Sequence, residues 1–291
     1  MVSSSPLGDY LRARRAALQP ADVGLTALPG RRVEGLRRDE VARLAGISQE
    51  YYLRLEQGRD RQPSEQVLFA LTRAMKLDNA AVAYMRRLVE FQAGGSRADD
   101  PRRLTEEMDR SLGSMLEQWA QTPAYIVDRN QTVVMSNPLA AALLPGILEP
   151  GISVPIAVFG SAWREMDRDW EETARRTVAS LRFNSDPDDR ELQRIVGVLA
   201  MRDPDFRRLW ARHEAHPHYV SPARLTLQGF GLLDFTRQTL LIPGHRRHVL
   251  TVLHAEADTV AADAVRALLS AEVNTRAGAG ERIRPRDAAI A

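Results

Sequence analysis

The chain has 291 residues, 44% of them hydrophobic, which is enough for about two domains that each bury a core. It contains no cysteine, which excludes disulfides and thiolate metal sites and makes a reducing cytoplasm the expected compartment. The first residues lack the basic start and apolar run of a signal peptide, and no apolar stretch approaches the roughly 18 residues of a membrane span. We therefore expect a cytoplasmic protein with no membrane partner.

Charge is distributed unevenly along the chain. Residues 1–91 carry 15 Arg and Lys against 11 Asp and Glu, a net charge of +4, whereas the remaining residues carry a net charge of −2. Basic residues concentrate counter-charge around a polyanion. This modest asymmetry favours nucleic acid as the partner of the N-terminal part.

Residues 1–92 are expected to form an all-α domain. Apolar residues recur at helical spacing in five segments. Gly46 can take the positive φ that ends a helix, and Ser48 and Ser64 are typical N-caps. The predicted helices are 7–18, 37–45, 49–57, 64–76 and 79–91.

The second and third of these helices are joined by the turn Ala45-Gly46-Ile47-Ser48, which predicts a helix-turn-helix. Tyr52 and Leu55 then face the core, and the opposite side of the third helix is free to contact double-stranded DNA. In such motifs the N-terminal part of the second helix enters the major groove, where glutamine and arginine read base edges. The predicted DNA face consists of Ser48, Gln49, Glu50, Tyr51 and Arg54.

Two positions on this face have an alternative interpretation. Tyr51 contacts either DNA or its own domain, and Glu50 either accepts a hydrogen bond from a cytosine amino group or is an ordinary solvated charge. Arginines on both sides of the motif are expected to contact phosphates, which position a protein without specifying sequence. These arginines are Arg31, Arg32, Arg37, Arg38, Arg59 and Arg61.

The rest of the chain predicts a linker, a second domain and a tail. Residues 93–103 are small and polar, as in a linker, and residues 272–291 are rich in Gly, Ala and Arg, as in a disordered tail. Between them, residues 104–271 predict a helix, two short strands, several helices, further strands and a closing helix. The strand-like runs are 124–128, 132–136, 224–228, 231–235, 239–242 and 248–254. This order is that of an α+β domain with one sheet.

Aromatic residues of the second domain are candidates for the lining of a ligand pocket, because such pockets are mostly apolar with a few polar anchors. The alternative is that they form ordinary core. A ligand carboxylate could meet Arg208, Arg212 or His213. The aromatic candidates are Trp119, Tyr125, Phe159, Trp163, Trp170, Phe206 and Trp210.

Three histidines, His213, His216 and His218, could in principle bind zinc. Pro217 breaks any helix there, so we expect surface histidines and no metal. The sequence also lacks a glycine-rich phosphate loop, a nucleophile elbow and a dinucleotide fingerprint. We expect neither a cofactor nor an enzymatic activity.

Residues 7–91 resemble the Xre family of helix-turn-helix proteins, and Gly30–Arg59 is similar to the subgroup that carries a C-terminal MmyB-like ligand-binding domain. Asp128–Ala142 and Phe206–His213 match that domain, so the resemblance covers about residues 7–271. It implies a PAS-like fold for the second domain and a bacterial regulator that responds to an apolar effector such as a fatty acid. A homodimer on a palindromic operator is expected. The alternative is a DNA-binding regulator whose second domain only dimerises or binds a protein.

Overall fold

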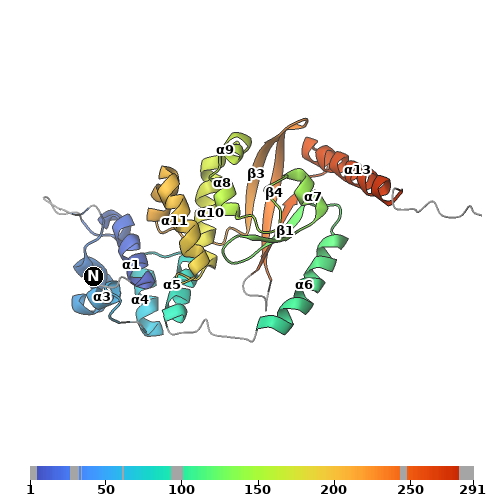
Figure 1. Cartoon of the computed structure of the whole chain (residues 1–291). Helices are drawn as coiled ribbons and strands as arrows, with labels where there is room; N and C mark the ends of the chain where they lie inside the picture. Colours follow the sequence, from blue (N-terminus) through green and yellow to red (C-terminus); the bar gives the residue numbers. More distant parts are fainter. Residues whose placement is uncertain are drawn as a thin grey trace, which may run out of the picture. The chain divides into compact units, whose positions relative to one another are not determined.

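The computed structural model describes residues 5–26, 33, 35–60, 62–92, 101–242 and 248–281. Contacts divide the chain into two compact units. The helical unit comprises Met1–Asp99 and Val178–Pro217, and the sheet unit comprises Asp100–Thr177 and His218–Ala291. Figure 1 labels most of the helices and strands of each.

The N-terminal stretch of the helical unit folds as the sequence predicts. Besides a short 3-10 turn, its described part holds five α-helices, α1 (Pro6–Ala17), α2 (Arg38–Ala45), α3 (Gln49–Glu56), α4 (Glu65–Ala74) and α5 (Asn79–Gln92). Ser48 caps α3 by accepting a hydrogen bond from the Tyr51 amide at 3.1 Å, and Ser64 caps α4 in the same way. The core of these helices includes the fully buried Tyr10, Leu11, Tyr52, Leu55 and Leu71. The all-α prediction is confirmed.

The helical unit also contains residues from much later in the chain. The second half of α10 (Trp170–Asn184) belongs to it, together with α11 (Arg190–Arg202) and α12 (Pro204–Ala211). Phe183 joins the core of the N-terminal helices, and its ring centroid lies 6.3 Å from that of Tyr84 on α5. The Arg87 guanidinium donates to the Asn184 carbonyl at 2.9 Å. These contacts join residues that the sequence assigned to different domains, 1–92 and 104–271. The predicted boundaries, with a linker at 93–103 between those domains, follow the order of the chain and remain a prediction.

The sheet unit is an antiparallel sheet with helices, as an α+β domain requires. Its strands are β1 (Ala124–Val127), β2 (Val133–Ser136), β3 (Val220–Leu227), β4 (Gly231–Leu241) and β5 (Val249–His254), in the spatial order β2-β1-β5-β4-β3. Its helices are α6 (Pro101–Gln118), α7 (Pro138–Leu143), α8 (Val154–Val158), α9 (Ser161–Met166), the first part of α10, and α13 (Val260–Glu281). The predicted α+β class is confirmed.

Two strands differ from their predictions, since β3 begins at Val220, four residues before the predicted run 224–228, and β4 joins two predicted runs into one. The sequence predicts separate strands at 231–235 and 239–242, yet β4 is continuous through the polar residues Thr236, Arg237 and Gln238. The reason is pairing on both sides, with Ser221 opposite Arg237 in β3 and Leu253 opposite it in β5. Ladder hydrogen bonds thus satisfy the backbone where the side chains give no strand signal.

Asn137 ties the start of the sheet to the helix that follows it. Its side chain is 2% exposed, donates to the Trp119 and Thr122 carbonyls at 2.9 and 2.8 Å, and accepts from the Ala124 and Ala140 amides. The last two contacts join β1 to the N-terminus of α7, where Asn137 is the N-cap and Pro138 the first helical residue.

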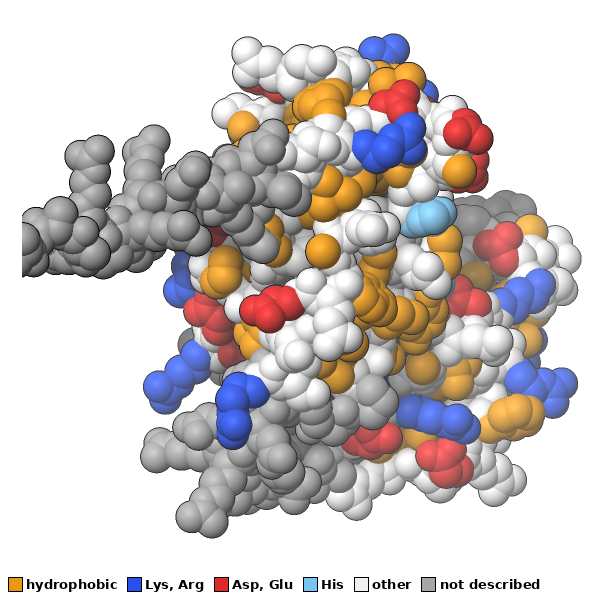
Figure 2. Space-filling view, turned by 90° about the vertical axis from the view of Figure 1, so that its right-hand side faces the viewer, with side chains coloured by type: hydrophobic (Ala, Val, Ile, Leu, Met, Phe, Trp, Pro, Cys, Tyr) orange, Lys and Arg blue, Asp and Glu red, His pale blue; other side chains and the backbone are white. Residues whose placement is uncertain are grey.

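The surface of the sheet unit carries exposed apolar residues. Figure 2 shows hydrophobic side chains lying among arginine and acidic ones on the face that it presents. The exposed large apolar residues of this unit include Trp119, Tyr219, Val220, Leu232, Leu240, Leu241 and Val260. Even so, none of the helices in the described ranges combines the length and apolarity needed to cross a membrane.

Candidate functional site

The turn between α2 and α3 has the geometry of a helix-turn-helix. Gly46 ends α2 with φ of +66°, a left-handed conformation that glycine adopts without strain. The Ile47 amide donates to the Ala42 carbonyl at 3.0 Å, which fixes the turn. Ala42 is only 2% exposed, so a small side chain is needed there.

The face of α3 that the sequence assigned to DNA is open to solvent. Ser48, Gln49, Glu50 and Arg54 are exposed and Tyr51 is half-buried, while Tyr52 and Leu55 on the opposite face are fully buried. Buried residues therefore hold the helix while polar groups that can hydrogen-bond to bases stand outward.

Side chains on this face also contact one another. The Arg54 guanidinium lies 3.7 Å from the Glu50 carboxylate and 5.3 Å from the centre of the Tyr51 ring. Burial and the nearby Asp60 carboxylate raise the pKa of Tyr51, so its hydroxyl stays protonated at neutral pH and can donate a hydrogen bond. Both contacts of Arg54 are solvent-exposed and weak, so they leave it available to a base.

The arginines assigned to phosphates fall into three groups. Arg59 and Arg37 are exposed, and Arg37 pairs with Asp39 at 3.1 Å. Arg38 is half-exposed, but its Nε donates to the buried Glu56 at 2.6 Å, so part of its hydrogen-bonding capacity is used within the domain. Arg31, Arg32 and Arg61 lie outside the described residues.

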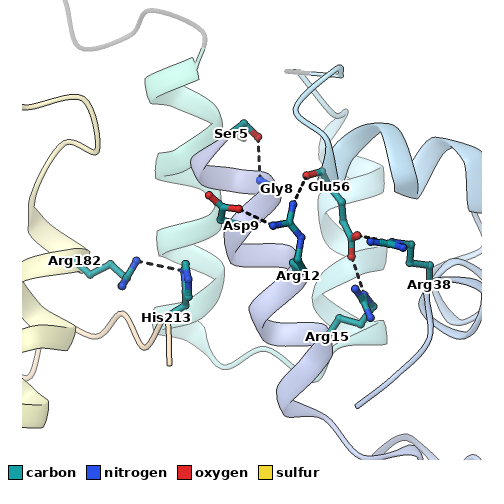
Figure 3. A network of polar contacts seen from close by, with 9 residues as sticks. All are labelled: Ser5, Gly8, Asp9, Arg12, Arg15, Arg38, Glu56, Arg182 and His213. Carbon is teal, nitrogen blue, oxygen red and sulfur yellow. Dashed lines mark hydrogen bonds and ion pairs between the residues drawn. The ribbon is translucent and has the colours of Figure 1, made fainter. Parts of the chain in front are cut away.

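Glu56 is the centre of a polar network that sequence reasoning missed (Figure 3). Its carboxylate, 1% exposed, accepts from Arg15 at 2.7 Å and from Arg38 at 2.6 Å, and its carbonyl accepts from Arg12 at 3.2 Å. The network thus joins α1, the start of α2 and the end of α3. A glutamate in the last turn of an amphipathic helix has the pattern of a surface charge, and no local signal marks it as buried.

Gly8 allows α1 to approach the end of α3 closely enough for this network. A Cβ at this position would lie 2.3 Å from the Glu56 carbonyl oxygen, well inside van der Waals contact. The requirement is for space, since Gly8 sits in an ordinary helix.

The predicted pocket residues of the sheet unit are held by local packing. Trp163 is buried and donates to the Asp167 carboxylate at 3.0 Å. Phe159 and Trp170 form an edge-to-face pair at 5.7 Å. Tyr125 is 6% exposed on β1, whereas Trp119 is 37% exposed. The structure therefore brings Phe159 and Trp170 together and leaves their role in ligand binding a prediction.

The remaining candidates belong to the helical unit. Phe206 is fully buried and stacks on Trp210 at 5.6 Å. Arg208 is exposed and pairs with Asp205 at 3.2 Å. Trp210 and His213 line a pocket of about 240 Å³.

This pocket contains a further residue that the sequence did not single out, the buried Arg182. Its guanidinium lies 3.7 Å from the centre of the Trp210 ring and contacts the His213 ring at 3.3 Å, as Figure 3 shows for the histidine. The rest of the lining is Pro6, Asp9, Tyr84, Ser185, Pro187, Leu192, Gln193 and Val196.

The pKa of His213 is lowered to about 4, mainly by burial and in smaller part by the positive charge of Arg182. The imidazole is therefore neutral at pH 7, and its Nδ1 accepts from Arg182 when the proton is on Nε2. His213 and His218 both have left-handed backbone angles, in keeping with a loop. Among the residues with described positions there is no group of three or more His, Asp or Glu that could hold a metal ion.

Comparison with known protein families identifies both parts of the chain. The helix-turn-helix domain model matches residues 6–85, and the MmyB-like transcription regulator ligand binding domain model matches residues 108–269. No curated protein sequence matches the chain. The second match covers more than half of the sequence and confirms the resemblance. The chain belongs to the MmyB-like transcription regulators, and it joins a helix-turn-helix DNA-binding domain to a ligand-binding domain.

Proposed function

We propose that this regulator reads a specific DNA sequence with the exposed face of α3. The observation that carries the proposal is the division of that helix, with Gln49, Glu50 and Arg54 exposed and Tyr52 and Leu55 fully buried. Arginine matches the acceptor edge of guanine and glutamine that of adenine, so this face offers two base-reading side chains. The exposed Arg37 and Arg59 are suited to phosphates.

The regulator is proposed to act as a homodimer in the bacterial cytoplasm, where the chromosome is accessible. Two copies of the motif would read half-sites about 34 Å apart, which corresponds to a palindromic operator. Its effector is proposed to be an apolar small molecule, of which a fatty acid is one example, because the candidate residues are aromatic with few polar anchors. No catalytic step is assigned to the chain.

The test begins with an operator selected from genomic fragments by the full-length protein. The double variant Gln49→Ala/Arg54→Ala is expected to bind that operator at least tenfold more weakly, because each base contact contributes about 1–3 kcal/mol. Arg194→Ala is the control, since it removes the same single charge from an exposed site on α11. Unchanged affinity of the double variant would show that α3 does not read the operator.

The effector proposal is tested on the same operator. Thermal shift and mass spectrometry of extracted small molecules should reveal a bound apolar compound, and adding that compound should change the DNA affinity. A ligand can do so only if it binds two states of the protein with different affinity. If no apolar compound binds and stabilises the protein, the second domain serves only dimerisation or protein contacts.

A further inference from the structure

Among the residues that the structure describes, Arg182 is the only buried cation that lines this pocket. It is 8% exposed, and its Nε lies out of contact with solvent and has no hydrogen-bond acceptor. A buried charge is costly unless a counter-charge or hydrogen bonds compensate it. Arg182 has hydrogen bonds, but they do not supply an opposite charge.

Every group that hydrogen-bonds to Arg182 is neutral at pH 7. Its Nη2 donates to the Trp210 carbonyl at 2.5 Å and its Nη1 contacts His213. The Tyr84 hydroxyl also lines the pocket, and burial raises the pKa of Tyr84 above its ordinary value, so that this group stays uncharged.

Asp9 is the carboxylate of the pocket lining, and it does not form an ion pair with Arg182. It is held by Arg12 at 3.0 Å, and Figure 3 shows this pair on α1. Asp9 nevertheless has a long-range effect, because it favours the charged forms of both Arg182 and His213. Because Asp9 repels negative charge, a singly charged anion is favoured here over a multiply charged one.

The walls of the pocket are otherwise largely apolar. Tyr84, Leu192, Val196 and Trp210 supply side chains with large apolar surfaces, and the volume of about 240 Å³ is slightly below that of typical ligand pockets. A compact apolar body fits these walls. A carboxylate supplies the opposite charge that the guanidinium lacks.

We propose that this pocket of the helical unit binds a small monocarboxylic acid with a compact apolar body, and that Arg182 pairs with its carboxylate. The proposal rests on the proposed function in one respect, since the ligand would act as an effector of DNA binding. The pocket is lined by α1 and α5 of the helix-turn-helix match and by residues 182–213 of the ligand-binding-domain match. A ligand there contacts both parts of the regulator.

Benzoate is the probe, and benzamide, which has the same shape without the charge, is its control. Isothermal titration of the full-length protein is expected to show one benzoate site per chain and at least tenfold weaker binding of benzamide. Equal binding of the two compounds, or no binding of benzoate at about 10 mM, would overturn the proposal.

Two variants locate the site. Arg182→Gln is expected to weaken benzoate binding at least tenfold, but it also removes contacts within the fold. Gln193→Trp therefore provides a second test, because Gln193 is exposed at the pocket lining and a tryptophan there would fill it. Arg194→Trp adds the same bulk at the next position, which does not line the pocket, and should leave benzoate binding unchanged. Benzoate binding that survives Gln193→Trp places the site elsewhere.

Operator binding without benzoate is measured in parallel. If DNA binding fails while benzoate binds as expected, the proposed function is wrong and the carboxylate site stands. If DNA binding succeeds and benzoate does not bind, the carboxylate site is wrong and the DNA-binding proposal stands.

Discussion

Replacing Glu56 with glutamine should destabilise the helical unit by about 3 kcal/mol, the lower end of the range for breaking a buried ion pair by removing one partner. The carboxylate is 1% exposed, and Arg15 is only 12% exposed, so Arg15 cannot be fully rehydrated when its partner loses its charge. The value is not larger because Arg15 keeps a hydrogen bond to the Leu36 carbonyl at 2.8 Å. The Arg38 side chain is 44% exposed and its guanidinium can be hydrated instead. The loss of its ion pair with Glu56 therefore adds little to the destabilisation.

Urea unfolding of the full-length protein, followed by circular dichroism, measures this change without the ionic screening that guanidinium salt would add. With an m-value of about 2 kcal/mol per molar, the midpoint of the helical transition should fall by about 1.5 M. Glu65→Gln is the control, because it removes an exposed carboxylate that pairs with Arg86 at 3.2 Å, and its effect should stay within about 0.5 kcal/mol.

The double replacement Glu56→Met/Arg15→Met separates loss of charge pairing from loss of packing. Replacing both partners of a buried pair by apolar residues is often neutral or stabilising, so the double variant should be more stable than Glu56→Gln. Equal midpoints for Glu56→Gln and Glu65→Gln would refute the reasoning, because they would mean that the buried carboxylate has no energetic role.

Two further predictions concern other parts of the chain. Asn137→Ala should destabilise the sheet unit by about 3 kcal/mol, because four buried hydrogen bonds lose their partner, and Asn137→Asp should cost at least as much in the same urea assay, because it replaces the donating amide by a buried carboxylate oxygen that faces the Trp119 and Thr122 carbonyls. His213 has a folded-state pKa of about 4, below its value of about 6.5 when unfolded, so the unfolded state takes up the proton first as the pH falls. The free energy of unfolding should therefore fall as the pH is lowered from about 6.5 to 4. The expected decrease is about 1–2 kcal/mol after allowance for the partial exposure of the ring. His213→Asn, which tolerates the same backbone angles, should lack this part of the pH dependence. An unchanged pH profile in that variant would contradict the assignment.

The N-terminal helices could be predicted because their signals are local. Ser48 and Ser64 cap their helices through hydrogen bonds to amides three residues ahead, and the turn at Gly46 is set by residues close to it in sequence. The continuous strand β4 could not be predicted, since its polar middle is held by partners in β3 and β5 that are distant in sequence. Strand pairing of this kind leaves little trace in the periodicity of one segment.

The candidate sites divide in the same way. The exposed face of α3 follows from helical periodicity, so the residues assigned to it could be identified from spacing. Glu56 and Arg182 could not, because charged residues are usually exposed and their burial depends on packing from other segments. Trp210 and His213 were identified as candidates by residue type, but their arginine partner comes from a helix some thirty residues earlier.

The contacts of α5 bear on how a ligand signal could reach the DNA-binding helices. Arg87 and Tyr84 lie on α5, and both pack against Phe183 or its neighbour Asn184 within the helical unit. Phe183 is adjacent to Arg182, the residue proposed to hold the ligand carboxylate. We therefore expect that a ligand which shifts Arg182 also shifts the core that supports α1 and α5, and this route does not need the linker. Coupling of this kind is reciprocal, so operator DNA should change the affinity for the carboxylate by the same factor as the carboxylate changes the affinity for DNA.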